Sequence, residues 1–229
     1  MDAREVYARH AEAYDELVRA EDVDGNLLPA LYDVCPLDGA RVVEVGAGTG
    51  RLTRLLLEAG AHVDATEGSA AMLEVARRNL GERARLTLRV ADARTLPCPD
   101  GEADVGIAGW VFGHLRHWMP EGWRDEIGQA LDELSRVVRP GGTLVVIETL
   151  GTTRTEPAPP NPDLAEYYAW LEKERGFVRT AIRTDYRFAS VDDASRVLGF
   201  FFGETKAAWP RTHDTAHVPE CTGIWSRFR

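Results

Sequence analysis

The sequence predicts a single α/β domain with a doubly wound, mostly parallel sheet and helices on both faces. Three observations lead to this prediction. An apolar run at residues 41–45 meets a glycine turn and then leucines at helical spacing, which is typical of a strand, a tight turn and a helix. Further strand-like and helix-like segments alternate along the chain. Glycine or proline stands at most boundaries between them, where helices often end or begin.

Seven segments have the short apolar or alternating pattern of strands. The predicted strands are residues 41–45, 62–67, 85–90, 104–110, 143–148, 177–188 and 222–228. The proline-rich stretch from Thr152 to Pro162 is predicted to contain no regular structure, because proline lacks the backbone donor that helices and sheets need.

Helices are predicted between the strands, where apolar residues recur at helical spacing. Their predicted ranges are 2–20, 26–37, 50–60, 69–81, 120–138, 161–176 and 190–203. Ser69 and Asn161 are suited to be N-caps, Ser190 begins a further helix, and Pro120 begins another. The first helix would carry one stripe formed by Val6, His10, Tyr14, Leu17 and Val18.

Length, charge and cysteine content exclude several classes of protein. A chain of 229 residues suits one domain. The formal net charge is −10, and the first 44 residues hold 11 acids against four arginines, so we expect no nucleic-acid partner. Cys35, Cys98 and Cys221 support neither a disulfide framework nor a zinc ribbon. Without an apolar run near ~18 residues or a signal peptide's apolar core, we expect a cytoplasmic protein with no membrane partner.

The glycine turn has the spacing G-x-G-x-G, at Gly46, Gly48 and Gly50, whereas a pyrophosphate-binding turn would be G-x-G-x-x-G. Glycines allow positive φ and let a ligand lie close to the backbone. Glu44 is the second discriminator, because a carboxylate at the tip of a buried strand is costly unless a cation or a donor meets it. A ligand with an ammonium group would meet Glu44, and a pyrophosphate would be repelled.

The run Val42-Val43-Glu44-Val45-Gly46-Ala47-Gly48-Thr49-Gly50 resembles the class I S-adenosylmethionine-dependent methyltransferases. The pattern L-x-R-V-V-R-P-G-G-T-L at residues 134–144 resembles them again. The resemblance covers roughly residues 40–150, and the chain looks most like the small-molecule group typified by the ubiquinone- and menaquinone-biosynthesis C-methyltransferases. It implies S-adenosylmethionine as cofactor and a Rossmann-like sheet of seven strands whose last strand returns antiparallel.

The resemblance also implies how the chain is organised. We expect an N-terminal helical lid at residues 1–38, a cofactor-binding core at 39–150, and substrate-side helices with the last two strands at 151–229, including insertions around strand six. The expected methyl acceptor is a small molecule with an O, N or C nucleophile. The expected assembly is a monomer or a homodimer.

The resemblance implies that Glu44 and the glycine turn hold the methionine part of the cofactor, and that Asp92 and Ala93 contact the adenine. Glu67 lies 21 positions past Gly46, about the distance at which a βαβ unit delivers an acid to a ribose. The thioether of Met72 suits the aromatic ring of adenine. For three positions an alternative stays open: Glu67 caps the helix at Ser69, Asp92 forms a turn, and Met72 packs against the sheet.

Two further residues complete the predicted cofactor site. A lid tyrosine, Tyr7 or Tyr14, would touch the cofactor, and Trp110 ends the fourth predicted strand. The predicted cofactor-binding residues are Tyr14, Glu44, Gly46, Ala47, Gly48, Gly50, Glu67, Gly68, Met72, Asp92, Ala93 and Trp110.

Methyl transfer from a sulfonium needs the donor and the acceptor held in line at ~3 Å, and it requires neither a metal nor a covalent residue. A general base helps when the acceptor is a hydroxyl or an acidic carbon. His114 and His117 follow the fourth predicted strand and are the candidate bases, since a histidine pKa suits proton transfer near neutrality. The alternative is that they only brace the loop.

The segment from Pro210 to Cys221 raises a metal site as a further alternative. His213 and His217 are four positions apart, but the flanking prolines argue against the helix that would align them. We predict no metal and interpret this segment as a loop bordering the acceptor pocket, with His217 or Glu220 as second candidates for the base.

Aromatic residues would line the acceptor pocket or simply form core. They are Tyr167, Tyr168, Trp170 and residues 200–202. Two other functional classes remain open, an NAD(P)-dependent oxidoreductase and a non-catalytic cofactor-binding or scaffold protein.

Overall fold

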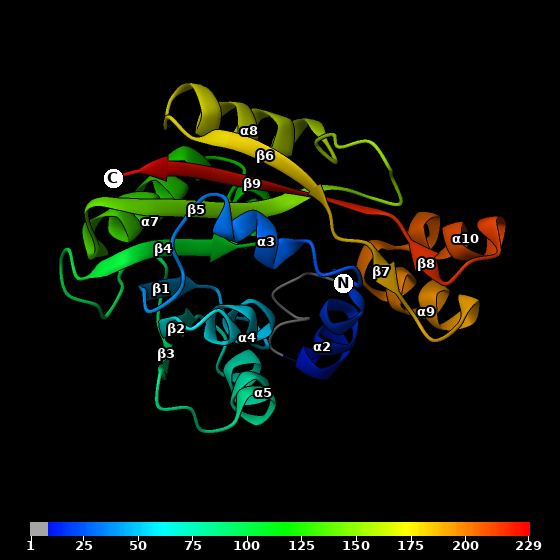
Figure 1. Cartoon of the computed structure of the whole chain (residues 1–229). Coiled ribbons are helices and arrows are strands. Elements are labelled where there is room, and N and C mark those ends of the chain that lie inside the picture. The colour runs from blue at the N-terminus through cyan, green and yellow to red at the C-terminus, as the bar shows by residue number, and fades with distance from the viewer. Residues whose placement is uncertain (1–8) are drawn as a thin grey trace.

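The computed structural model describes residues 9–229, and its centre is a seven-stranded sheet in the order β3-β2-β1-β4-β5-β9-β6 (Figure 1). Strands β1 to β5 pair in parallel, and β9 runs antiparallel to both of its neighbours. This confirms the predicted sheet. The strands are β1 (Arg41–Val45), β2 (His62–Glu67), β3 (Leu86–Val90), β4 (Ala103–Gly109), β5 (Val138–Thr152), β6 (Val178–Arg183) and β9 (Glu220–Phe228).

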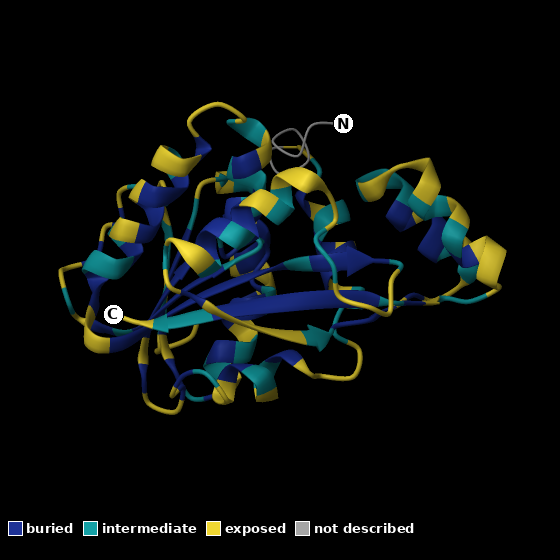
Figure 2. Ribbon diagram, turned by 90° about the horizontal axis from the view of Figure 1, so that it is seen from above, coloured by how far each residue is buried: buried dark blue, intermediate teal, exposed yellow. Residues whose placement is uncertain are grey.

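Helices cover both faces of the sheet, whose strands are largely buried between them (Figure 2). Helices α3 and α4 share one core with Val42 and Val63, and α7 and α8 share the other with Val43 and Leu144. No helix among residues 9–229 is long and apolar enough to cross a membrane. The helices are α2 (Ala11–Ala20), α3 (Leu27–Tyr32), α4 (Arg51–Glu58), α5 (Ala70–Leu80), α6 (Phe112–Trp118), α7 (Trp123–Val137), α8 (Pro162–Lys173), α9 (Val191–Phe202) and α10 (Glu204–His213).

The strand order reverses between β1 and β4, which pair in parallel with Val45 opposite Ala108. In open α/β sheets a ligand crevice forms at the carboxyl ends of the strands at such a reversal. The glycine turn follows β1 directly, and Trp110 follows β4. The fold therefore brings these two predicted segments to the same edge of the sheet.

Side-chain caps fix the starts of three helices where the sequence places them. The side chain of Ser69 accepts a hydrogen bond from the backbone N–H of Met72 at the start of α5. Asn161 caps α8 and Ser190 caps α9 in the same way. These predictions are confirmed, because a cap depends on residues that are near neighbours in the chain.

A small outlying unit lies beside α2. Strands β7 (Tyr186–Arg187) and β8 (His217–Val218) form a two-stranded antiparallel sheet, and α9 and α10 connect them. Leu17 of α2 packs into the apolar cluster of this unit. Helix α2 consequently lies between α5 and α9, on the side of the molecule that carries the glycine turn (Figure 1).

The predicted strand 177–188 is wrong as a single strand. Pairing of β6 with β9 ends at Arg183, opposite Cys221. The carbonyls of the next two residues, Thr184 and Asp185, accept hydrogen bonds from residues 22 and 23 of the N-terminal segment. The chain leaves the main sheet there, because partners distant in sequence take up its backbone groups.

Several predicted boundaries are also corrected. The helix predicted from Pro120 begins at Trp123, because Gly122 has a φ of 81° that a helical residue cannot keep, and residues 112–118 form the unpredicted helix α6. The helix predicted for residues 120–138 was expected to end at residue 138. That residue is instead the first residue of β5, which spans 138–152 rather than the predicted 143–148. Helix α3 stops at residue 32, so the predicted range of 26–37 is too long.

The N-terminal helix is shorter in its described part than predicted. His10 has non-helical backbone angles and precedes α2. Val6 and Tyr7 lie outside the described residues.

The interpretation of residues 210–221 as a loop is wrong for most of the segment. Residues 204–213 form α10 with Pro210 inside it, residues 217–218 form β8, and residues 220–221 begin β9. The ring of His213 stacks on Trp209, with centroids 4.1 Å apart, and its Nδ1 lies 2.9 Å from the Trp209 carbonyl. Pro210 has no backbone N–H and cannot donate a helical hydrogen bond, and the contacts of His213 with Trp209 stabilise the last turn of α10.

Candidate functional site

A cleft of about 340 Å³ lies at the carboxyl ends of β1, β2 and β4. Nine of the twelve predicted cofactor residues line it, namely Tyr14, Gly46, Gly48, Glu67, Gly68, Met72, Asp92, Ala93 and Trp110. A Cβ on Gly48 would already stand 3.6 Å from Tyr14 and 3.7 Å from Met72. The turn therefore leaves its bare backbone facing the cleft, which suits close approach of a ligand.

Glu44, Ala47 and Gly50 do not line the cleft. Glu44 is 1% exposed, and neither of its carboxyl oxygens has a hydrogen-bond partner among the described residues. Burial raises the pKa of this carboxyl to about 7. The expected contact between Glu44 and a ligand ammonium stays a prediction, and the carboxyl lies below the turn rather than in the cleft wall.

Glu67 connects the glycine turn to α5. One oxygen of its carboxylate accepts a hydrogen bond from the Gly48 N–H at 2.9 Å, and the other accepts from the Ser69 N–H at 2.8 Å. Burial raises its pKa. Glu67 thus contacts the start of the helix and also lines the cleft, so the two readings of this residue are compatible. Each carboxylate oxygen can accept a further hydrogen bond from a ligand hydroxyl.

Asp92 follows β3 in a tight turn and also faces the cleft. Its Oδ1 accepts from the backbone N–H and from the Nε of Arg94, both at 2.8 Å. Hydrogen bonding to Arg94 lowers the pKa of Asp92, so the group is a carboxylate, an acceptor suited to an amino group. Met72 is 2% exposed and forms an apolar part of the cleft wall.

The charges and acceptors of the cleft fit an adenine nucleoside. Glu67 offers acceptors for ribose hydroxyls, Asp92 offers an acceptor for an exocyclic amine, and Met72 offers an apolar surface. No cation other than Arg94 lines the cleft among the described residues, and Arg94 is paired with Asp92 and Glu126. A pyrophosphate would therefore find no free cation here.

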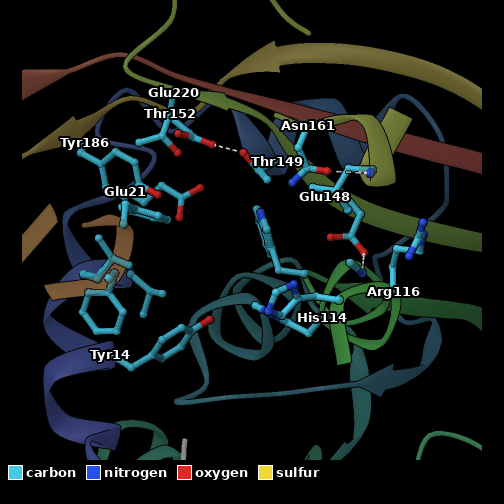
Figure 3. A pocket seen from close by; sticks show the side chains of 18 of the residues that line it. Tyr14, Glu21, His114, Arg116, Glu148, Thr149, Thr152, Asn161, Tyr186 and Glu220 are labelled. Atoms are coloured by element: carbon cyan, nitrogen blue, oxygen red, sulfur yellow. Dashed lines mark hydrogen bonds between the residues drawn. The ribbon is translucent and has the colours of Figure 1, made fainter. Parts of the chain in front are cut away.

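A second cavity of about 320 Å³ (Figure 3) adjoins the cleft, and Tyr14, Trp110 and His114 line both. Apolar side chains of α2 and α9 form one wall of it. Buried carboxyl groups from three separate segments, Glu21, Glu148 and Glu220, face it as well. The three shared residues mark the place where molecules in the two cavities would meet.

Trp110 is held at this junction by unusual local geometry. Its φ is 54°, and its backbone N–H donates to the Ile147 carbonyl at 2.7 Å. The guanidinium carbon of Arg51 lies 4.1 Å from the centre of a Trp110 ring, and Arg51 Nη1 lies 2.7 Å from Glu21. The sequence prediction missed Arg51 and Glu21. The available signal was the position of Arg51 directly after the third glycine of the turn.

His114 is half-buried at the junction, and its ring stacks on Trp118 with centroids 5.5 Å apart. Burial, followed by the nearby His117, lowers the pKa of His114 to about 4. The expectation of a pKa near neutrality is therefore wrong for His114, whose imidazole is uncharged at pH 7. His117 lines the second cavity only.

Two more candidate residues are placed as follows. His217 Nε2 lies 3.2 Å from Asp185, outside both cavity walls. Cys221 is buried and donates to the Arg154 carbonyl at 3.5 Å. Residues 9–229 contain no cluster of three His, Cys, Asp or Glu side chains suited to hold a metal.

The structure separates the two groups of aromatic residues. Tyr167, Tyr168 and Trp170 pack in the core between the sheet and α8, as the alternative reading proposed. Residues 200–202 of α9 line the second cavity. The helical stripe in the sequence could not distinguish the two cases, because core and pocket positions share the same spacing.

Raising the pH from 6.5 to 8 is expected to lower the melting temperature of the cofactor-free protein. Burial raises the pKa of Glu44 to about 7 and those of Glu148 and Glu220 to about 8, above the ordinary 4.5. Between pH 6.5 and 8 these three carboxyls bind more protons in the folded chain than in the unfolded chain, so the stability of the fold falls as the pH rises. The lowered pKa of His114 acts in the opposite direction only below its ordinary 6.5.

A pH series of thermal melts checks this expectation. Glu148→Gln should reduce the slope, because the amide cannot ionise. A melting temperature that rises between pH 6.5 and 8 would contradict the three raised pKa values.

Comparison with known proteins agrees with this geometry. A methyltransferase domain model matches residues 43–146. Demethylmenaquinone methyltransferase of Clavibacter sepedonicus is 37% identical over 145 residues, which are 59% of this chain and 56% of that protein. The chain therefore matches little more than half the length of this relative.

Solved structures share the fold. An S-adenosylmethionine-dependent methyltransferase from Aquifex aeolicus superposes with a TM-score of 0.55 at 17% identity, covering 88% of each chain. The [4+2]-cyclase SpnF superposes with a TM-score of 0.55 at 22% identity, covering 89% of this chain and 80% of that one. A methyltransferase domain model thus matches just under half of this chain, and the chain shares the fold of a solved S-adenosylmethionine-dependent methyltransferase.

Proposed function

We propose that the protein transfers the methyl group of S-adenosylmethionine to a small molecule bound in the second cavity, releasing S-adenosylhomocysteine. The observation that carries this proposal is that the cleft and the second cavity share Tyr14, Trp110 and His114. Methyl transfer requires donor and acceptor to meet end to end, and two cavities that adjoin at one place supply that arrangement. The name of the Clavibacter relative supports a small-molecule acceptor.

The residues of the cleft would hold the cofactor in a defined direction. We assign Glu67 to the ribose hydroxyls, Asp92 and Ala93 to the adenine edge, and Met72 to the adenine face. The turn at Gly46 and Gly48, with Glu44 below it, would hold the methionine part. The bound cofactor supplies the reactive methyl group, and its sulfonium would then face the junction lined by Trp110.

The second cavity would orient the acceptor and exclude water. The neutral imidazole of His114 can accept a proton or a hydrogen bond from the acceptor, although its pKa of about 4 makes it a weak base. Positioning therefore contributes more to this mechanism than proton removal. His117 is assigned a secondary role, since it lines the acceptor side only.

Calorimetry and an acceptor screen test the proposal. S-adenosylhomocysteine should bind with micromolar or tighter affinity, while NAD and NADP should show no heat at the same concentration. Purified protein with labelled S-adenosylmethionine should then methylate a member of a small-molecule library. Binding of NADP but not of S-adenosylhomocysteine would favour an oxidoreductase, and cofactor binding without any methylated product would favour a non-catalytic role, since fold does not determine activity.

His114→Ala is expected to lower turnover at least tenfold and to change S-adenosylhomocysteine affinity less than threefold, since His114 lies at the junction. Because its imidazole is already neutral, the wild-type rate should show no inflection near pH 6.5 from this residue. Steady-state rates with an identified acceptor check both points. His117→Ala serves as the matched comparison, and wild-type turnover in His114→Ala would remove this residue from the mechanism.

The division of the chain into lid, core and substrate-side regions stays a prediction. The cytoplasmic location, the absence of a nucleic-acid partner and the monomeric or dimeric state also stay predictions.

A further inference from the structure

Glu220 has an unsatisfied carboxyl oxygen at the wall of the second cavity. The residue is 1% exposed and lines the cavity. The Thr149 hydroxyl donates to its Oε1 at 2.5 Å, and the nearby Thr152 side chain also lowers the pKa of the carboxyl, whereas Oε2 has no partner in hydrogen-bond geometry among the described residues. A buried carboxyl oxygen without a donor is costly, and a bound ligand that donates to it would remove the cost.

The charges around Glu220 are not balanced. Glu21 is close enough to raise the pKa of Glu220 further, after burial. Arg51 pairs with Glu21, and Lys206 directs its ammonium to the Thr152 carbonyl and the Thr153 hydroxyl. The Asp185 carboxylate on the other side accepts from the Glu220 backbone N–H and adds no positive charge. Lys206 lowers the pKa of Glu220 less than Glu21 raises it, and among residues 9–229 no cation forms a direct ion pair with Glu220.

The cavity around these acids is lined with aromatic rings and apolar side chains. Tyr186 lies beside Glu21 and Glu220 (Figure 3), and Tyr14 and Trp110 line both this cavity and the cleft. Glu220, Thr152 and Glu21 gather on one side of the cavity, and Glu148 and Arg116 lie on the other (Figure 3). Burial raises the pKa of the Glu220 carboxyl to about 8, so the group is mostly protonated at pH 7 while the cavity is empty. A bound ammonium would lower that pKa and hold the group as a carboxylate, and the aromatic faces beside it also attract a cation.

We propose that the methyl acceptor carries a basic nitrogen and that its ammonium group binds Glu220. This inference rests on the proposed function, since it names the acceptor class for the same cavity. Glu220 acts here in recognition, and the nitrogen it binds need not be the atom that is methylated. An acceptor that presents a carboxylate or a phosphate to Glu220 would be repelled once this group is ionised.

Three probes of similar shape separate charge from fit: benzylamine, benzyl alcohol and benzoate. S-adenosylhomocysteine binding is measured first by calorimetry, and its absence would end the proposed function rather than this inference. With that ligand saturating, the wild type should bind benzylamine at least tenfold more tightly than benzyl alcohol, and benzoate should not bind. Equal binding of the amine and the alcohol, or no binding of the amine, would overturn the inference without requiring any variant.

Glu220→Gln keeps the shape of the side chain and removes its charge. This variant should lose the preference for benzylamine and should bind S-adenosylhomocysteine within twofold of the wild type. Glu148→Gln changes a carboxyl in the same cavity that already accepts from the Gly113 N–H at 2.9 Å, so the preference should remain. Glu82→Gln makes the same charge change at an exposed position outside both cavities and controls for net charge.

The pattern across these variants decides the assignment. A preference that is lost only in Glu220→Gln supports it. A preference that persists in Glu220→Gln, or that disappears in Glu148→Gln instead, would place the cation elsewhere and overturn the assignment.

Discussion

Glu67→Ala is expected to weaken S-adenosylhomocysteine binding by ~1.5–3 kcal/mol, which is more than tenfold in affinity. The reason is that the carboxylate is assigned to accept hydrogen bonds from the ribose hydroxyls, and alanine offers no acceptor. Calorimetric titration of the purified variant gives the change directly. An affinity equal to that of the wild type, in a variant that melts cooperatively, would refute the ribose assignment.

A chemical control separates ribose binding from the structural role of Glu67. The carboxylate also accepts from the Gly48 and Ser69 N–H groups, so alanine loosens the turn as well. An S-adenosylhomocysteine analogue without the 2′-hydroxyl should bind the wild type more weakly than the parent compound does. In Glu67→Ala the parent and the analogue should bind alike, because the partner of that hydroxyl is gone.

Ser69→Ala provides the matched control for the helix start. It removes the side-chain cap on Met72 and keeps the carboxylate of Glu67. We expect it to lose ~0.5–2 kcal/mol of stability and to keep its cofactor affinity. A large loss of affinity in Ser69→Ala would indicate that Glu67 acts through the helix start alone.

Gly46→Ala is expected to lower the free energy of unfolding by ~2–5 kcal/mol and to abolish measurable cofactor binding. Gly46 has a φ of 76°, and a Cβ there would overlap the Cγ2 of Val111. Its N–H also donates to the Thr66 carbonyl at 2.8 Å, which ties the turn to β2. Relief of the overlap would shift the backbone that faces the cleft. Urea unfolding and calorimetry measure the two effects.

Gly81→Ala separates backbone strain from overlap. Gly81 has a φ of 63° and a ψ of −171°, and a Cβ at this position would meet no atom within 4 Å, so only the backbone strain of ~1–3 kcal/mol applies. The double variant Gly46→Ala with Val111→Ala should recover the part of the lost free energy of unfolding that comes from the overlap. A double-mutant cycle isolates this part. Equal losses in Gly46→Ala and Gly81→Ala would show that the overlap with Val111 is relieved without cost.

The sequence alone was sufficient for the central sheet and for bringing many of the named residues to one cleft. Strand segments, helix caps and the glycine turn depend on residues that are close in the chain, so their signals are complete in one stretch of sequence. The distance from Gly46 to Glu67 follows from the length of one βαβ unit, and the structure places both in the cleft wall. Boundaries failed where a distant segment competed for the backbone, as at Thr184.

The burial of a side chain could not be predicted from its position in a motif. Glu44 stands two residues before the turn, yet it is buried below it, and His114 follows β4, yet its pKa falls to about 4. Both results come from burial, which depends on the segments that pack over the residue. The residues next to it in the sequence do not indicate which segments these are.

The sequence by itself determined the doubly wound sheet, the glycine turn and the acid that ends β2, because near neighbours or one βαβ unit encode them. Only the tertiary structure decided the second cavity. Its acids, Glu21, Glu148 and Glu220, come from the end of α2, from β5 and from the start of β9, which are brought together by the packing of segments far apart in the chain. Their charge balance arises from that convergence, since no stretch of sequence contains more than one of them.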